Sequence, residues 1–277
     1  DSMSDLFHED VPFEFIDRVF AVMALTPRHT YQVLTKRPER MAEYFNDFGR
    51  ANIRVYDAAT EIVNADFDRF PGDMASKRSS GGSWWPLPNV WLGTSVEDQA
   101  RADERIPHLL RCPASVRFLS VEPLLGHVDL EFQPKACPSC GRGDFITTTR
   151  TKGADTICGC AGERCADAPL LPTIDWVIVG GESGAHARPC DVRWIESVVT
   201  QCKAAGVPVF VKQLGARVWA QDRPAPYSRE EPHGRLIEAA PPDYLFSFKN
   251  RKGSDPEEWP SYLRVREWPV GFVPSSL

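Results

Sequence analysis

The sequence lacks a long hydrophobic run, a leader segment and an excess of positive charge. No apolar stretch approaches the ~20 residues needed to cross a bilayer, so we expect no membrane partner. No basic and then apolar leader precedes the first predicted helix, which indicates a cytoplasmic protein. The formal net charge is −6, whereas a generic nucleic-acid binder usually carries a basic excess, so nucleic acid is not indicated as a partner.

Cysteine is scarce outside one short stretch. Five of the eight cysteines lie close together: Cys137, Cys140, Cys158, Cys160 and Cys165. This crowding favours a metal site over a disulfide framework. Cys137 and Cys140 form a C-x-x-C knuckle, and two of the later three would complete a tetrahedral four-thiolate zinc site, with one cysteine left over. An iron–sulfur cluster would use the same thiolates, and ordinary reduced cysteines are the remaining alternative.

The most informative stretch is residues 175–184, Asp-Trp-Val-Ile-Val-Gly-Gly-Glu-Ser-Gly. Its apolar run predicts a strand buried on both faces, as in a parallel sheet. The run stops at Gly180, Gly181, Glu182 and Ser183, where glycines allow close backbone approach and the side chains offer an acceptor and a donor. Ligands bind beyond the carboxyl ends of such strands, so we expect a site here. The alternative is a tight turn with a solvated carboxylate.

The same strand-then-polar pattern recurs along the chain, alternating with helical periodicity. Further strands are predicted at residues 30–36, 89–97, 115–123 and 208–213. Helices are predicted at residues 10–25, 38–48, 98–111 and 191–205, the last closed by a glycine cap at Gly206. Residues 50–88 are predicted to be irregular. The alternation indicates an α/β fold, which we interpret as a partial β/α barrel of parallel strands.

Most of the predicted strands end in charged residues. They are Asp5, Lys36, Glu97, Glu122, Glu182 and Lys212. Because parallel strands carry their carboxyl ends to the same side, we expect these residues to line one small-molecule cofactor site, together with Ser95. A helix cap would equally explain Ser95, and a favourable helix-terminus charge would explain Glu97. The paired Trp84 and Trp85 are predicted to cap the end of the domain, with a place at the rim of the site as the alternative.

The alternation of predicted strands and helices divides the chain into four parts. Residues 1–123 and 173–215 are predicted to form the barrel, residues 124–172 the cysteine-rich insertion, and residues 216–277 a C-terminal extension packed on the barrel. The insertion is too short to build a core of its own, so we expect its zinc to be structural. The chain opens at Asp1 within the end of a predicted strand, and we expect it to be a fragment.

Several stretches together resemble the phage gene-product 37/68 family, an uncharacterised group. They are SMSDLFH at 2–8, LTKRP at 34–38, WLGTSVE at 91–97, SVEPL at 120–124, VGGESG at 179–184, KQ at 212–213, DPEEWP at 255–260 and LRVRE at 263–267. Members of this family look like radical S-adenosylmethionine proteins. The resemblance implies a [4Fe–4S] cluster on three cysteines that precede the first stretch, so those cysteines are not among the residues of this chain.

Two functions follow as expectations. The first is part of a phage-related radical S-adenosylmethionine-like enzyme of unknown substrate, which is inactive as this fragment. In this enzyme the strand-end carboxylates would bind ribose hydroxyls or an amino group, and Lys36, Lys212 or Arg188 would bind a carboxylate or phosphate. The second is a non-catalytic phage-derived binding or scaffold protein with a structural zinc module. A lyase that uses Lys36 or Lys212 as a Schiff-base nucleophile is a third possibility.

The cysteine spacing generates a direct test. We expect protein purified under reducing, chelator-free conditions to carry about one zinc per chain, because four thiolates suffice for one tetrahedral site. Metal analysis measures the content, and Cys137→Ser or Cys140→Ser should remove it. Protein that carries no metal under these conditions would refute the zinc site.

Overall fold

The computed structural model describes residues 4–46, 48–64, 85–130, 145–146, 157–158, 174–221, 235–240 and 243–272. The chain divides into two compact units, which we describe separately. Unit 1 comprises residues 1–95 and 103–120, and unit 2 comprises residues 96–102 and 121–277. Among the described helices, none has the length and apolar character that a bilayer crossing requires.

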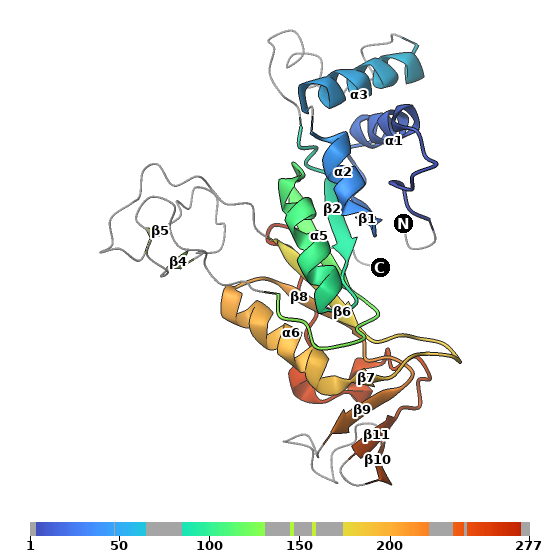
Figure 1. Cartoon of the computed structure of the whole chain (residues 1–277), viewed down its shortest axis with the longest axis vertical. Coiled ribbons are helices and arrows are strands. Elements are labelled where there is room, and N and C mark those ends of the chain that lie inside the picture. The colour runs from blue at the N-terminus through green and yellow to red at the C-terminus, as the bar shows by residue number, and fades with distance from the viewer. Residues whose placement is uncertain are drawn as a thin grey trace. The chain divides into compact units, whose positions relative to one another are not determined.

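Unit 1 contains three parallel strands (Figure 1). They are β1 (Tyr31–Thr35), β2 (Val90–Ser95) and β3 (Val116–Val121). All six residues of β2 are buried, as expected for a central strand that is covered on both faces. The register pairs Thr35 with Thr94 and Ser95 with Ser120, so the polar ends of the three strands lie at one edge.

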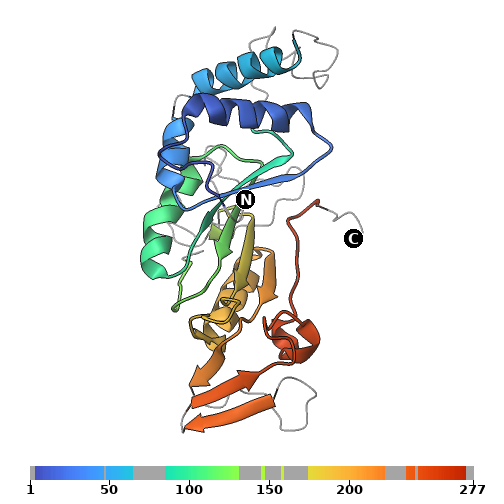
Figure 2. The same ribbon diagram turned by 90° about the vertical axis from the view of Figure 1, so that its right-hand side faces the viewer.

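The helices of unit 1 follow the predicted order, with one addition. They are α1 (Phe13–Leu25), α2 (Pro38–Tyr44), α3 (Phe48–Ile62) and α5 (Gln99–Arg111). The prediction that residues 50–62 are irregular was wrong: α3 buries one apolar face, which includes Val55, Tyr56 and Ala59, and exposes Asp57 and Glu61. Figure 2 shows α3 lying alongside α1.

A buried charged cluster holds these helices together. Asp17 of α1 accepts a hydrogen bond from the Tyr44 hydroxyl at 2.6 Å. It also forms an ion pair with Arg54 of α3 at 3.0 Å. Arg54 also lies over the Tyr44 ring, 5.3 Å from its centroid. Burial is the main reason that the pKa of Tyr44 is raised, and its hydrogen bond to Asp17 adds to the effect. The carboxylate tolerates burial because Arg54 compensates its charge and the Tyr44 hydroxyl supplies a hydrogen bond.

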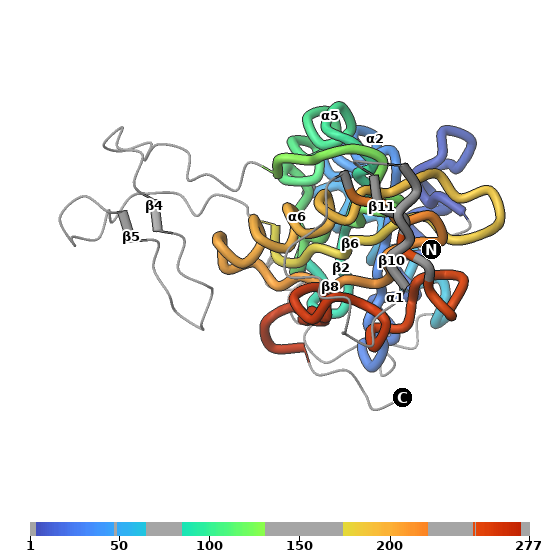
Figure 3. The backbone as a smooth tube through the Cα atoms, turned by 90° about the horizontal axis from the view of Figure 1, so that it is seen from below, coloured from blue at the N-terminus to red at the C-terminus, as the bar shows by residue number. Residues whose placement is uncertain are grey.

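Unit 2 contains a parallel pair of strands with one helix packed on them. β6 (Trp176–Gly180) pairs with β8 (Val209–Gln213), and α6 (Val192–Ala205) packs on both (Figure 3). Asp191 caps α6 by accepting a hydrogen bond from the Arg193 amide at 2.9 Å. The predicted C-cap is confirmed, since Gly206 adopts the left-handed conformation with φ 67°.

A second sheet in unit 2 was not predicted. Its order is β10-β11-β9-β7, and β9, β10 and β11 pair antiparallel. The strands are β7 (Cys190–Asp191), β9 (Val218–Gln221), β10 (Arg235–Ala240) and β11 (Asp243–Ser247). Two short 3₁₀ helices follow, η2 (Pro256–Glu258) and η3 (Ser261–Leu263). The segment predicted only as a C-terminal extension therefore carries much of a sheet.

In unit 1 the parallel strands have the order β1-β2-β3, and in unit 2 β6 pairs in parallel with β8. The sequence predicted a partial barrel of parallel strands. The parallel pairing is confirmed, and among the described residues no strand pairs β8 with β1, so the barrel stays a prediction. Strands that alternate with helices and end in polar residues occur in both open sheets and barrels, so the pattern alone does not specify closure.

The cysteine-rich insertion lies largely outside the described residues. Cys137, Cys140, Cys160 and Cys165 all fall there, and Cys158 is described only as part of a strand backbone. That strand, β5 (Ile157–Cys158), pairs antiparallel with β4 (Phe145–Ile146). The predicted metal site remains a prediction.

Packing in unit 1 gives a testable consequence at Gly93. A Cβ at this position would lie 2.5 Å from the ring of Phe118, which is buried on β3. We expect Gly93→Ala to lower the free energy of unfolding by about 1–3 kcal/mol, because overpacking strains a close-packed core. Chemical denaturation measures the loss. Gly126→Ala is the control, since a Cβ there would meet nothing within 4 Å; equal effects of the two substitutions would contradict the packing argument.

Candidate functional site

Polar side chains are buried at the carboxyl ends of the strands in unit 1. They are Thr35, Thr94, Ser95 and Ser120. The Thr94 hydroxyl donates to the Thr35 carbonyl oxygen at 2.9 Å, which ties β2 to β1. Buried polar groups of this kind must be hydrogen-bonded to be tolerated. The strand ends of unit 1 therefore carry a layer of buried polar side chains.

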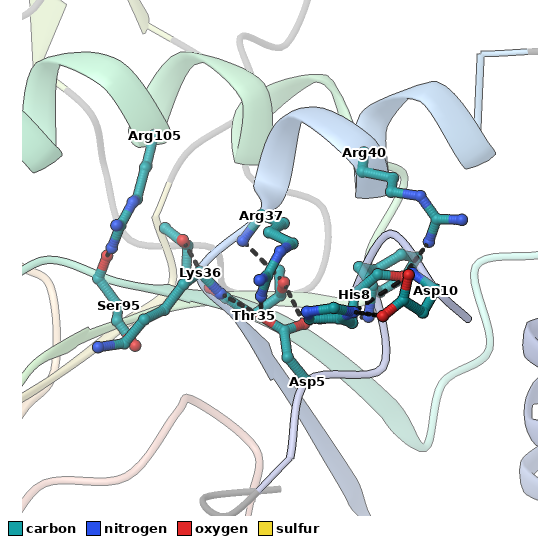
Figure 4. Close-up of polar contacts among 11 residues, drawn as sticks. Asp5, His8, Asp10, Thr35, Lys36, Arg37, Arg40, Ser95 and Arg105 are labelled. Atoms are coloured by element: carbon teal, nitrogen blue, oxygen red, sulfur yellow. Dashed lines mark hydrogen bonds and ion pairs between the residues drawn. The ribbon is translucent and has the colours of Figure 1, made fainter.

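Asp5 is anchored to the end of β1 by its side chain (Figure 4). One carboxylate oxygen accepts from the Thr35 hydroxyl at 2.6 Å and from the Phe7 amide at 3.0 Å. The other accepts from the Lys36 amide at 3.0 Å and from the Arg37 guanidinium at 3.1 Å. These four bonds use much of the acceptor capacity of a carboxylate. Asp5 thus fixes the segment before α1 to the end of β1.

The electrostatics of Asp5 follow from these bonds. Burial by itself raises the pKa of this carboxyl, but the hydrogen bonds from Thr35, Lys36, Phe7 and Arg37 together outweigh burial and lower the pKa below its ordinary value. Bonds of this kind favour the charged form. Asp5 was predicted to bind a cofactor; the structure gives it a structural role, and the cofactor role stays a prediction.

Lys36 and Ser95 stand at neighbouring positions just beyond the paired residues Thr35 and Thr94. The Lys36 side chain is exposed, and Figure 4 shows it extending from the end of β1 toward Ser95. The Ser95 carbonyl oxygen accepts from the Arg105 guanidinium at 2.9 Å. Ser95 does not cap α5, because Asp98 accepts the hydrogen bond of the Arg101 amide at 2.9 Å.

In unit 2 the structure pairs two predicted site residues. Lys212 of β8 donates to the Glu122 carboxylate, with 3.3 Å between nitrogen and oxygen. The Glu122 side chain is 13% exposed and that of Lys212 is 58% exposed. Ninety residues of sequence separate the two. The pair combines a shielded carboxylate with an ammonium that reaches solvent.

Backbone bonds bring two more predicted residues to the same place. The Leu124 amide donates to the Gly180 carbonyl oxygen at 3.0 Å, and the Leu125 amide donates to the Glu97 carbonyl oxygen at 2.8 Å. The segment after Glu122 is therefore hydrogen-bonded both to the end of β6 at Gly180 and to the segment that contains Glu97. Glu122, Gly180, Glu97 and Lys212 are thus close together in unit 2, and their role in a cofactor site stays a prediction.

The two glycines have a packing role that the sequence did not indicate. A Cβ at Gly180 would lie 2.7 Å from the Gln213 carbonyl oxygen, and one at Gly181 would overlap the Leu214 carbonyl oxygen. The Gln213 side-chain amide also donates to the Gly181 carbonyl oxygen at 2.8 Å. The glycines were predicted to let a ligand approach; in the structure they let the last residue of β8 and the residue after it approach.

Glu182 forms the second charged pair of unit 2. Arg188 donates to it from its backbone amide at 2.8 Å, from Nε at 2.8 Å and from Nη2 at 3.1 Å. The side-chain and backbone hydrogen bonds from Arg188 lower the pKa of Glu182, and the Glu182 bonds raise the pKa of Arg188, to which the Glu97 charge adds. Glu97 itself is buried. Ser183 lies exposed in the following loop.

Trp85 is a packing residue of unit 1. It is buried, its ring packs on Phe20 and Phe45 with centroids 5.1 Å away in each case, and its indole N–H donates to the Pro113 carbonyl oxygen at 2.9 Å. These contacts favour the predicted capping role over a place at a rim. Trp84 lies outside the described residues.

Some residues at these strand ends were not singled out from the sequence. Arg37, Arg105 and Gln213 each contact a predicted residue or its backbone. Arg37 directly follows Lys36, and Gln213 directly follows Lys212, so adjacency to a strand end was the available signal. No described group of three His, Cys, Asp or Glu residues is arranged to hold a metal ion.

Comparison with known proteins gives one match. A family model described as a protein of unknown function, DUF5131, matches residues 1–251. The matched range contains both the Asp5 anchor and the Glu122–Lys212 pair. Comparisons with the curated proteins and with the solved structures find no match.

The Asp5 anchor predicts a pH-dependent contribution to stability. Its lowered pKa means that the ionised form stabilises the fold fully above the unfolded value of about 3.9, and that this stabilisation is lost as pH falls through the folded pKa. We expect Asp5→Asn to cost about 1–3 kcal/mol at pH 7 and less in acid. Denaturation at pH 7 and at pH 3 measures both. Asp10→Asn, at an exposed carboxylate, is the control; a cost that does not shrink in acid would contradict this account.

Proposed function

Because the chain belongs to the DUF5131 family, a family of unknown function, we propose a function from its site: the chain is the ligand-binding part of an enzyme of the radical S-adenosylmethionine type. The observation that supports the proposal is the charged cluster of unit 2. It places the carboxylates of Glu97, Glu122 and Glu182 with the cations Lys212 and Arg188 at the ends of parallel strands. Ligand sites of α/β proteins lie at such ends.

Lys212 and Glu122 supply complementary groups for a zwitterionic ligand. An ammonium has three donors, and the Lys212 side chain reaches solvent, so it can bind a ligand carboxylate while it contacts Glu122. The Glu122 carboxylate is largely shielded, which strengthens its attraction for a ligand ammonium. The pair therefore suits a small molecule with an amino acid end.

The donor and acceptor set fits S-adenosylmethionine, the cofactor that the resemblance implies. Its amino acid end carries an ammonium and a carboxylate, and its ribose carries two hydroxyls. Glu122 and Glu182 would accept from the ammonium and the hydroxyls, and Lys212 or Arg188 would bind the carboxylate. A [4Fe–4S] cluster would supply the electron for its reductive cleavage, and we assign none of the described residues to that cluster. Substrate and reaction are not specified by this site.

The cysteine-rich insertion belongs to the proposal as a structural zinc module. Its five cysteines have the number and spacing for one four-thiolate site. Metal binding would supply the folding free energy that so short an insertion cannot gain from a hydrophobic core.

One observation favours the alternative of a non-catalytic binding or scaffold protein. The Asp5 carboxylate receives four internal hydrogen bonds, and Glu182 receives three from Arg188. Carboxylates that are satisfied internally stabilise loops without any ligand. The two functions differ in whether the Glu122–Lys212 pair binds a small molecule.

Calorimetric titration with S-adenosylmethionine separates the two functions. We expect Lys212→Met and Glu122→Gln each to weaken binding about tenfold or more, since losing a hydrogen bond to a charged group costs about 1.5–3 kcal/mol. Lys203→Met, at an exposed lysine of α6, is the matched control and should bind like the parent chain. Absence of binding, or equal binding by all variants, would favour the scaffold protein.

A further inference from the structure

The C-terminal segment pairs with the edge of β8. Phe210 and Arg266 form an antiparallel bridge. The Val211 amide donates to the Val265 carbonyl oxygen at 2.9 Å, and the Glu267 amide donates to the Val209 carbonyl oxygen at 2.9 Å. Arg266 also lies over the Phe210 ring, 5.4 Å from its centroid. These contacts fix the backbone of β8 immediately before Lys212.

The same segment fixes the backbone immediately after Gln213. The Leu214 amide donates to the Gly253 carbonyl oxygen at 2.9 Å, and that oxygen also accepts from the Trp259 indole at 3.0 Å. Gly253 has a positive φ of 59°, and a Cβ there would overlap the Gly215 carbonyl oxygen. Trp259 is fully buried. Only glycine allows this close approach.

Gly253 is itself held in place by a buried carboxylate. Glu258 accepts hydrogen bonds from the Lys249 amide at 2.7 Å and from the Asn250 amide at 3.0 Å. The Gly253 amide donates to the Asn250 carbonyl oxygen at 2.8 Å, which closes the turn. The turn is therefore anchored before it reaches Leu214.

We propose that residues 253–267, which we call the strap, position the Lys212–Glu122 pair. Val211 of β8 and Leu214, the residue after β8, each donate to the strap, so Lys212 and Gln213 lie between two fixed points. Gly253 is a positioning residue of this strap. The strap begins beyond residue 251, where the match to the family model ends. The inference concerns the site of the proposed function and rests on it only for what the pair binds.

The alternative is that the strap only stabilises unit 2. A stabilising strap would leave the Lys212–Glu122 contact unchanged in every variant that remains folded. A positioning strap loosens the contact when the strap is displaced. The reactivity of the Lys212 amine distinguishes the two, because an ammonium held by a carboxylate is acylated more slowly than a free one.

Trace acylation with acetic anhydride, read by peptide mass spectrometry, measures this reactivity. The rate at Lys212 is divided by the rate at the exposed Lys203 of α6 in the same sample. Four proteins are compared with the parent chain: Glu122→Gln, Gly253→Ala, their double variant, and Gly271→Ala. Gly271 also has a positive φ, of 85°, but a Cβ there would meet nothing within 4 Å. Circular dichroism confirms folding.

We expect Gly253→Ala and Glu122→Gln to raise the Lys212 ratio to a similar extent, about two- to fivefold for a pair of this exposure. The double variant should show no further increase, and Gly271→Ala should match the parent chain. The proposal is overturned if folded Gly253→Ala leaves the ratio unchanged, if the two effects add, or if Glu122→Gln has no effect. If Gly253→Ala does not fold, Glu267→Ala takes its place, because Glu267 accepts from the Val209 amide at 3.1 Å.

This experiment uses no ligand, so its outcome is separate from that of the proposed function. If Gly253→Ala leaves the Lys212 acylation ratio unchanged while the chain binds S-adenosylmethionine, only the role of the strap is refuted. If Gly253→Ala raises the ratio but the chain does not bind S-adenosylmethionine, only the proposed cofactor is refuted.

Discussion

Parallel pairing is the constraint on which this chain's organisation depends. Strands that are joined by helical crossovers are covered on both faces, so their interior residues are mostly apolar, as the buried Val90, Trp91 and Leu92 of β2 illustrate. Polar side chains of these strands gather toward their carboxyl ends. Since parallel strands stop on the same side, Thr35, Thr94, Ser95 and Ser120 collect at one edge of unit 1.

Collecting polar groups at buried edges requires compensation for their lost hydration. Asp5 obtains it from Thr35, Arg37 and two backbone amides, and Glu122 obtains part of it from Lys212. Unpaired buried charges would cost far more than these contacts return. Charge pairing at the strand ends is therefore a condition of the fold, and the same pairs provide the groups that a zwitterionic ligand would contact. Structure and proposed function draw on one set of side chains.

Much of the element order could be predicted from the sequence, because strongly periodic apolar segments dominate it. The strand predicted at residues 208–213 is β8, and the helix predicted at residues 191–205 is α6, each within a residue or two. α3 was missed since exposed charged residues interrupt its buried face, and the second sheet of unit 2 was missed since the apolar runs of β10 and β11, at residues 236–237 and 244–246, are short. Closure into a barrel depends on pairing between distant strands, which periodicity does not report.

The sequence predicted which residues lie at the strand ends better than it predicted which residues they contact. Strand-end position correctly indicated that Glu122 and Lys212 would meet, because topology alone brings them together. It gave no sign that Arg188 would hold Glu182, or that Gly181 would pack against Leu214, since both depend on loop conformation. Loop contacts follow from local backbone geometry, which short polar stretches encode weakly.

The packing of Phe118 over Gly93 has a consequence for how this sequence can change. The aromatic ring occupies the volume that a side chain at position 93 would need, so the two positions share one space across adjacent strands. A larger residue at 93 becomes acceptable only when residue 118 becomes smaller. The two positions should therefore vary together among relatives that keep this pair of strands, and a swap of large for small across the strands would preserve the core volume.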